Sequence, residues 1–293
     1  MLLLTGATGQ VGSALLPRLL ADGQRVRCLV RDPRRLGAQR VRVQIALGDL
    51  ADPPSFRNAL RGVHTVVHLA ASMRDQPRAS IEELDGIATW RMVESAERQG
   101  VERFVFFSAL GASTHHRVRA LRAKALAEQA VREADLCSLV FAPSLLYAPG
   151  DARLTLIERL AWLPAMPIAG GGRALFQPLW ADDAAACVLA ALRTSEPPQH
   201  ARFELAGPET LSRADVVRTV LRSLGRERPL VPVPIPVVAR ALALLERALG
   251  ARAFASWDEA ELLETAMTSP RGAADAQALG VAPQRMSAVL GSS

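Results

Sequence analysis

Three glycines near the amino terminus, Gly6, Gly9 and Gly12, follow one another at three-residue intervals. They lie between a short apolar run, Met1–Thr5, and an amphipathic stretch that begins at Gln10. In a strand–loop–helix unit, such glycines permit a tight turn, close approach of the main chain to a pyrophosphate, and close packing of helix on strand. The helix N-terminus then offers free N–H groups to phosphate. We therefore expect a dinucleotide site that includes Gly6, Thr8, Gly9, Gln10, Val11 and Gly12.

The end of the second apolar run, Arg25–Val30, bears on the choice of nucleotide. NAD sites usually place an acidic residue here for the ribose 2′-hydroxyl, whereas NADP sites use arginine. Arg31 stands at this position, with Arg34 and Arg35 close behind, and arginine can hold a phosphate through two hydrogen bonds. We expect Arg31 and Arg34 in the site. Asp32, one residue later, keeps NAD(H) open as the alternative. The pattern favours NADP(H).

An acidic residue also follows the third apolar run. Asp49 and Leu50 come after Gly48. The carboxylate could accept a hydrogen bond from the adenine amino group while Leu50 covers the ring. The alternative is that Asp49 caps the helix that begins near Pro53.

The elements that must position these residues alternate along the first half of the chain. Short aliphatic runs alternate with helical patterns, which indicates βαβ units and a parallel sheet covered on both faces. We predict an α/β fold, a Rossmann-type doubly wound parallel sheet with a smaller, mostly helical C-terminal domain. The expected strands are 1–5, 25–30, 41–46, 64–69, 103–108 and 136–141, and the expected helices are 10–21, 55–60, 80–99 and 113–134.

The regular alternation of expected strands and helices ends after Tyr147, where proline and glycine become frequent. We expect residues 1–147 and 174–206 to form the nucleotide-binding domain, with a helix at 181–193 and a strand at 201–205. Residues 148–173 and 207–293 are expected to form a small substrate or partner domain, with helices at 212–224, 237–249 and 257–267. The helix at 237–249 is the most apolar of these, which fits a core helix or, alternatively, contact with lipid or a lipophilic tail.

Composition limits the partners. The net charge is +6, but the arginines are spread along the chain and aromatic residues make up only 4%, so we expect no nucleic-acid partner. Cys28, Cys137 and Cys187 are too widely spaced for a metal motif, and we expect no metal site. No basic leader precedes the first apolar run. These features favour the cytoplasm, with peripheral contact to the inner membrane as a further option.

Together these segments resemble the extended and atypical short-chain dehydrogenases/reductases, over almost the whole length. The resemblance is closest to the subgroup around the NADPH-holding accessory subunit of respiratory complex I, with NmrA-like proteins next. It adds Ala70, Ala71, Pro143 and Ser144 to the expected cofactor site. The matching segments are 5–12, 48–50, 68–71, 108–112, 143–151, 177–183 and 203–209.

The chain departs from this family in its catalytic residues. Family enzymes use a serine, a tyrosine and a lysine, with the tyrosine four residues before the lysine on one helix face. Ser108 and Lys124 are present, and Lys124 is the only lysine among 35 basic residues, but Ala120 stands where the tyrosine is expected. We expect Lys124 to bind the cofactor and Ser108 to polarise a substrate or to make an ordinary strand-end hydrogen bond. His116, if on the same helix, could replace the tyrosine as an acid, although a surface role is the simpler reading.

The sequence leaves two functions open. The first is an NADP(H)-dependent oxidoreductase acting on a quinone-like or small carbonyl acceptor, whose proton can come from water. The second is a non-catalytic NADPH-bound assembly factor or redox sensor with a protein partner. Epimerase or dehydratase chemistry is disfavoured because in this family it depends on the missing tyrosine.

Overall fold

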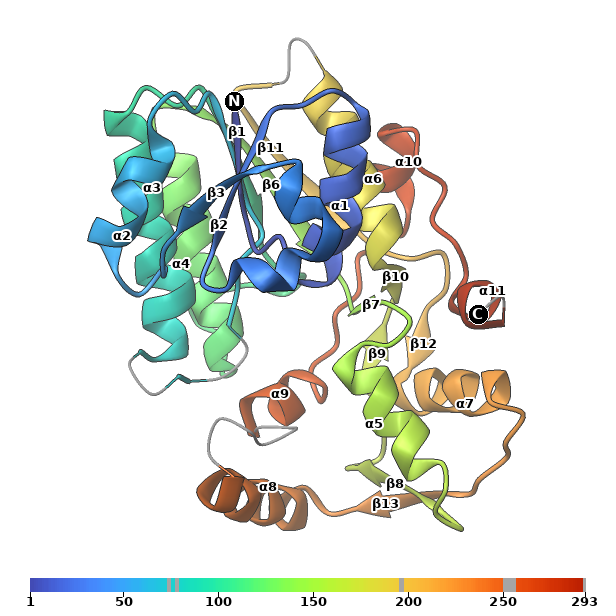
Figure 1. The fold of residues 1–293 in the computed structure, drawn as a ribbon. Helices are drawn as coiled ribbons and strands as arrows, with labels where there is room; N and C mark the ends of the chain where they lie inside the picture. Colours follow the sequence, from blue (N-terminus) through green and yellow to red (C-terminus); the bar gives the residue numbers. More distant parts are fainter. Residues whose placement is uncertain (73–74, 77–78, 195–197, 250–256, 292–293) are drawn as a thin grey trace.

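A parallel sheet forms the centre of the structure, a computed structural model that describes residues 1–72, 75–76, 79–194, 198–249 and 257–291 (Figure 1). Its seven strands lie in the order β11-β6-β5-β4-β1-β2-β3, and every pairing is parallel. The order reverses at β1, which is the arrangement of a doubly wound Rossmann sheet. The predicted fold class is confirmed. The strands are β1 (Leu2–Thr5), β2 (Val26–Val30), β3 (Gln44–Leu47), β4 (Thr65–His68), β5 (Arg103–Phe107), β6 (Cys137–Pro143) and β11 (His200–Leu205).

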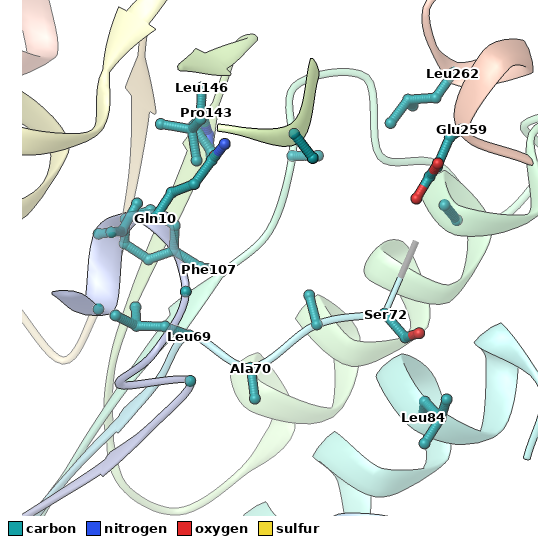
Figure 2. Close-up of a pocket in the computed structure, with 18 of the residues that line it drawn as sticks. Gln10, Leu69, Ala70, Ser72, Leu84, Phe107, Pro143, Leu146, Glu259 and Leu262 are labelled. Carbon is teal, nitrogen blue, oxygen red and sulfur yellow. The ribbon is translucent and has the colours of Figure 1, made fainter. Parts of the chain in front are cut away.

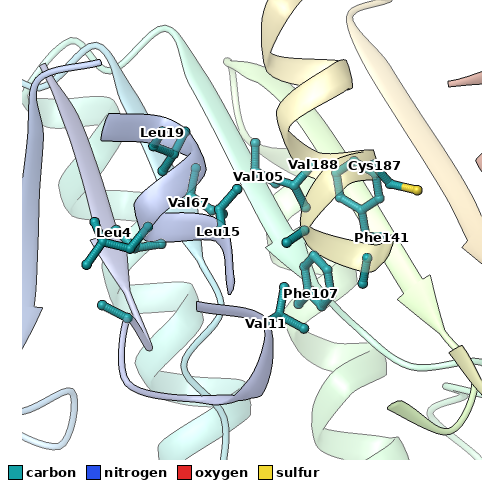
Figure 3. Close-up of a cluster of buried hydrophobic side chains, with 14 of the residues drawn as sticks. Leu4, Val11, Leu15, Leu19, Val67, Val105, Phe107, Phe141, Cys187 and Val188 are labelled. Carbon is teal, nitrogen blue, oxygen red and sulfur yellow. The ribbon is translucent and has the colours of Figure 1, made fainter. Parts of the chain in front are cut away.

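Both faces of the sheet are buried because successive apolar side chains on a strand point to opposite faces. Leu4 packs in one apolar cluster and Leu3 in the other. Phe107 and Phe106 divide between the clusters in the same way. Figure 3 shows the first cluster, where Leu15 of α1 and Val188 of α6 cover the strands.

Helices cover the two faces in groups (Figure 1). The first face carries α1 (Gln10–Ala21) and α6 (Ala181–Arg193), and the second carries α2 (Pro53–Arg57), α3 (Ala88–Arg98) and α4 (Arg119–Glu133). Short 3-10 segments, η1 (Pro33–Val41) and η2 (Asn58–Leu60), join strands and helices on the way. A π-helical turn, η3 (Glu82–Ile87), directly precedes α3.

The largest differences from the expected helix bounds occur in two helices. The helix expected over 113–134 begins only at Arg119, and a hydrogen bond from the Val118 N–H to His116 Nδ1 closes the turn before it. The helix expected over 257–267 is α9 (Trp257–Leu262), followed by a turn.

The remaining segments extend beyond the carboxyl edge of the sheet, at the lower end of Figure 1. Three strand pairs connect them: β7 with β10, β9 with β12, and β8 with β13. The helix α10 returns to the sheet, where Asp275 accepts a hydrogen bond from the Glu204 N–H. None of the described helices has both the length and the apolar character needed to cross a membrane. The bounds are β7 (Leu146–Tyr147), α5 (Ala152–Leu160), β8 (Met166–Ala169), β9 (Leu175–Phe176), β10 (Leu179–Trp180), β12 (Leu211–Ser212), α7 (Arg213–Ser223), β13 (Leu230–Val233), α8 (Ile235–Leu249), α10 (Ala274–Ala278) and α11 (Met286–Gly291).

Candidate active site

A cavity of about 1070 Å³ opens at the carboxyl ends of the central strands. It begins at the glycine loop after β1 and extends past the ends of β5 and β6 to α5, α8 and α9. Figure 2 shows Gln10 and Phe107 on the sheet side of this space and Glu259 on the opposite side, with the chain from Leu69 through Ala70 to Ser72 along its lower side. This edge of a doubly wound sheet is where such folds bind ligands.

The glycine loop has the geometry of a phosphate cradle. Gly6 has φ +69°, and a Cβ there would lie 2.6 Å from the Ala70 nitrogen. A Cβ on Gly12 would lie 2.1 Å from the Gly6 carbonyl oxygen. Both glycines are therefore required by the fold itself. Gly9 is different, because a Cβ there would meet only the Gly6 oxygen, at 3.3 Å.

Gly9 is the N-cap of α1, and no side chain caps this helix end. The first-turn N–H groups of an uncapped helix are available to an anion. The first turn also contains no acidic residue that would repel one. The loop residues Gly6, Thr8, Gly9, Gln10, Val11 and Gly12 all line the cavity, so this end of the cavity fits a pyrophosphate.

The end of β2 supplies positive charge. Arg31, Asp32 and Arg35 line the cavity, and Arg31 donates a hydrogen bond to the Gln76 side chain across it (2.9 Å). The Asp32 carboxylate accepts the Arg34 main-chain N–H and thereby begins the following 3-10 turn. Arg34, which we expected in the site, is exposed and is not among the residues that line the cavity, whereas its neighbour Arg35 is.

Asp49 and Leu50 line the same end of the cavity, beside Leu29 and Val30. One oxygen of the Asp49 carboxylate accepts the Ala51 N–H (3.0 Å). The carboxylate therefore has a local structural role and still faces the space where an adenine would lie.

Lys124 lies below the centre of the cavity, on α4. Its ammonium donates a hydrogen bond to the Phe107 carbonyl (2.9 Å), and lies 3.6 Å from the Asp85 carboxylate and 5.0 Å from the centre of the Phe106 ring. Lys124 also lines the cavity, although only 7% of it is exposed. The lone lysine is thus held in one position by groups on two other elements, β5 and η3.

Ser108 and Ala120 line the cavity on either side of this lysine. The Ser108 hydroxyl is buried and has no hydrogen-bond partner. A buried hydroxyl without a partner costs free energy, so a ligand that pairs with it gains affinity. Ala120 presents only a methyl group, and no described side chain takes the place of the family's tyrosine there.

His116 does not join this group. Its alternative role as an acid required it to share a helix face with Ala120 and Lys124, and this alternative is wrong because α4 begins at Arg119, after His116. His116 is absent from the residues that line the cavity. Pro143 and Ser144 do line it, but the Ser144 hydroxyl already donates to the Met267 carbonyl (2.6 Å) and accepts the Gln177 N–H (2.9 Å).

Sequence reasoning missed Asp85, which lies in the π-helical turn η3. Its side chain is fully buried, and one carboxylate oxygen accepts the Ser72 N–H (2.8 Å). Burial raises the pKa of Asp85, and the charge of Lys124 opposes that shift. An acidic residue among Ile81, Leu84 and Ala88 was the only signal in the sequence. π-helical turns are often associated with functional sites.

His68 has a supporting role beneath the loops. It is fully buried at the end of β4, with hydrogen bonds to Thr5 (2.9 Å) and Thr89 (3.2 Å). Burial, and secondarily the charge of Lys124, lower the pKa of His68 to about 3, so the ring is neutral. Thr5 also accepts the Ala70 N–H, and Ala70 and Ala71 both line the cavity. The network therefore fixes the chain that touches Gly6.

The far end of the cavity is apolar. Most side chains there are aliphatic, and only three of the lining residues at that end are charged: Arg153, Arg213 and Glu259. Arg213 pairs with Glu264, and Arg153 donates to the Leu146 carbonyl (2.8 Å). The apolar lining comes from α5, α8, α9 and the turn that follows: Leu156, Leu160, Val238, Leu242, Leu262, Leu263 and Met267.

Comparison with known proteins agrees with this geometry. Residues 6–159 match a family described as NAD(P)H-binding. The chain is 28% identical over 247 residues to a ceramide reductase of Caulobacter vibrioides, covering 83% of this chain and 76% of that protein. It is 29% identical over 250 residues to NADH dehydrogenase (ubiquinone) 1 alpha subcomplex subunit 9 of Arabidopsis thaliana, covering 81% of this chain but only 61% of the subunit.

A solved structure shares the fold. The Escherichia coli NADPH-dependent quinone oxidoreductase QOR2, complexed with NADPH, superposes with a TM-score of 0.76 at 15% identity and covers 99% of this chain and 98% of its own. The match to the family extends over more than half of the 293 residues. This chain therefore belongs to the NAD(P)H-binding family, among the atypical, NmrA-like short-chain dehydrogenases/reductases.

Proposed function

We propose that this protein is an NADPH-dependent reductase of a lipophilic, readily reduced acceptor, a quinone or an activated carbonyl compound. The observation that carries the proposal is the continuity of the cavity. One end holds the glycine loop and two arginines, the centre holds Ser108 and Lys124, and the far end is apolar. An elongated cofactor at the first end would place its reactive end at the centre, facing the apolar chamber.

The residues at the centre suit reduction of an acceptor that needs little acid catalysis. NADPH, when bound, supplies a hydride. The free Ser108 hydroxyl can donate a hydrogen bond to the acceptor's oxygen, and Lys124 can hold the cofactor ribose while fixed to the Phe107 carbonyl. Ala120 can give no proton, and a readily reduced acceptor can take its proton from water. This favours a quinone over an unactivated ketone.

The arginines at the end of β2 support NADPH as the cofactor. Arg31 and Arg35 both line the cavity where a 2′-phosphate would lie. The name of the Caulobacter vibrioides relative, ceramide reductase, supports both reduction and a substrate with an apolar tail. The same choice of acceptor fits the residues that could have acted as acids, because neither His116 nor Tyr147 lines the cavity and Ala120 has no acidic group.

The test is NADPH oxidation by the purified protein with quinones of increasing tail length and with aldehydes and ketones of matched size. Turnover with quinones or activated carbonyls, reduced in Lys124→Ala and Ser108→Ala, is the expected result. NADPH binding is measured in parallel by tryptophan fluorescence. NADPH binding without turnover on any acceptor would overturn the reductase proposal.

The alanine at position 120 favours a second function, because it leaves the site without the family's proton donor. The name of one relative, a subunit of NADH dehydrogenase, supports the same function. The protein could therefore hold NADPH as a fixed structural ligand and act as an assembly factor or redox sensor. In that case, NADPH binds tightly, no acceptor oxidises it, and its loss changes binding to a protein partner.

A further inference from the structure

An exposed apolar strip lies at the end of the molecule farthest from the sheet, and we call it the α8 edge. Trp162 is 76% exposed, Leu244 65% and Val237 51%. A single exposed apolar side chain is common on protein surfaces. A group of large exposed apolar side chains usually marks an interaction site. The α8 edge consists of Trp162, Leu163, Val231, Ile235, Val237 and Leu244.

These residues come from two parts of the sequence that the pairing of β8 with β13 brings side by side. Trp162 follows α5, and the Arg226 guanidinium stacks 3.6 Å from the centre of its ring. Arg226 and Arg228 both donate hydrogen bonds to the Ala161 carbonyl. From there β13 pairs with β8 and leads directly into α8, along the lower end of Figure 1.

The helix α8 has apolar residues on two sides. Val238 and Leu242, four residues apart, line the cavity. Val237 and Leu244 are exposed on another face, and Arg240 and Arg247 are exposed at the intervals that place them along the same stripe. A helix with a core-facing apolar side normally has a polar outer side, and here the outer side alternates arginine with aliphatic residues.

The charge around this edge has one predominant sign. Residues 158–163 and 222–249 contain six arginines and three glutamates. Arg159, Arg222, Arg240 and Arg247 are exposed. Arginine stems can lie along an apolar surface while their charged ends reach phosphate, and tryptophan prefers the same interfacial depth. At the surface of an anionic bilayer, the aliphatic residues and the tryptophan can insert among the lipids while the arginines contact the phosphate groups.

We propose that the α8 edge docks on the surface of a bilayer that contains anionic phospholipid. The proposal is independent of the function proposed above, because it needs no turnover and no particular cofactor. It also has a consequence for the cavity. Since Val238 and Leu242 form the inner side of the same helix, the apolar chamber lies directly behind the docked face. A lipophilic molecule could then pass from the bilayer to the chamber without crossing water.

The experiment is co-sedimentation of the full chain with phosphatidylcholine vesicles that either contain or lack phosphatidylglycerol. We expect binding to vesicles with phosphatidylglycerol, weaker binding to the neutral vesicles, and loss of binding as salt is added. Val237→Ser/Leu244→Ser should lower the vesicle affinity by roughly tenfold or more, since each side chain loses apolar burial. Arg240→Glu/Arg247→Glu should lower binding to the anionic vesicles selectively.

Matched controls lie on the other side of the molecule. Trp90 and Leu126 are 51% and 49% exposed on α3 and α4, so Trp90→Ser/Leu126→Ser removes comparable apolar surface. Arg91→Glu/Arg132→Glu makes the same change in net charge at exposed positions of the same helices. Both control pairs should bind vesicles as the wild type does, and thermal melting verifies that every variant is folded.

Three results would overturn the proposal. The first is no binding to anionic vesicles, and the second is equal loss in the edge and control pairs. The third is self-association that Val237→Ser/Leu244→Ser abolishes while vesicle binding stays absent, which would assign the edge to a second copy of the chain. None of these results bears on NADPH oxidation, so the two proposals fail separately.

Discussion

The Lys124 ammonium lies 3.6 Å from the carboxylate of Asp85, and neither side chain is more than 9% exposed. The two residues come from different helical segments, α4 and the π-helical turn η3. The carboxylate is anchored by the Ser72 N–H and the ammonium by the Phe107 carbonyl. Because Ser72 and Lys124 line the cavity and Asp85 does not, Asp85 acts on the site through the lysine.

This buried pair predicts a coupling energy that a double-mutant cycle can measure. Asp85→Asn keeps an acceptor for the Ser72 N–H but leaves the buried ammonium without its counter-charge. We expect the free energy of unfolding to fall more for Asp85→Asn in the wild type than in a Lys124→Met background, with a coupling of about 1–3 kcal/mol. Urea denaturation of the four proteins gives this value. Additive losses would show that the pair has no energetic link.

Gly9 predicts a clean separation of folding from nucleotide binding. Its φ of −82° and ψ of 177° suit any residue at an N-cap, and aspartate and asparagine are both preferred there. Gly9→Asp should therefore fold as well as Gly9→Asn, yet its carboxylate would face the pyrophosphate. We expect NADPH affinity to be roughly a hundredfold lower in the aspartate variant than in the asparagine variant. Isothermal titration measures both. Equal affinities would remove the phosphate site from this loop.

The glycine loop and the sheet could be foreseen because their causes are local. A strand buried on both faces must be apolar along its length, as Leu2, Leu3 and Leu4 are, and a tight turn followed by an uncapped helix needs glycine at fixed intervals. These requirements are visible in a few consecutive residues.

Three features could not be foreseen: the burial of Asp85, the placement of Arg35 rather than Arg34 at the cavity, and the start of α4. The burial of Asp85 depends on η3 packing against α4, and no short window of sequence contains both elements. Arg35 rather than Arg34 lines the cavity because of how the 3-10 turn after Asp32 winds. The residues 113–118 have acceptable helix propensity, but the hydrogen bond from Val118 to His116 closes a turn there instead.

The three arginines after β2 predict a graded effect on cofactor choice. Arg31 and Arg35 line the cavity and Arg34 does not, so Arg34→Ala serves as the matched control. If a 2′-phosphate lies there, Arg31→Ala and Arg35→Ala should each weaken NADPH binding about tenfold, the value of one charge-assisted hydrogen bond, and affect NADH much less. Dissociation constants for both nucleotides test this. Equal losses of affinity for NADPH and NADH would count against a preference for NADP(H). A large effect of Arg34→Ala alone would show that the 2′-phosphate lies at Arg34, one of the two arginines expected from the sequence.

His68 predicts how the stability of the fold depends on pH. Its pKa is lowered to about 3 in the folded protein, from an ordinary value of 6.5, so below pH 6.5 the unfolded chain binds a proton that the folded chain does not. The free energy of unfolding should therefore fall as the pH drops from 6.5 toward 3, by about 1.4 kcal/mol per pH unit from this one group.

Other groups also contribute to the pH dependence. The raised pKa values of Asp85 and Asp183 affect the free energy of unfolding in the opposite direction, since these groups retain protons in the folded protein that the unfolded chain releases. Those groups, and His64 with its lowered pKa, remain in a His68→Asn variant, so the difference between wild type and variant isolates His68. Urea denaturation between pH 7 and pH 5 should show a steeper acid loss in the wild type than in His68→Asn. Parallel curves would mean that the ring is not held neutral between Thr5 and Thr89, and the fixed position of Ala70 beside Gly6 would then need another cause.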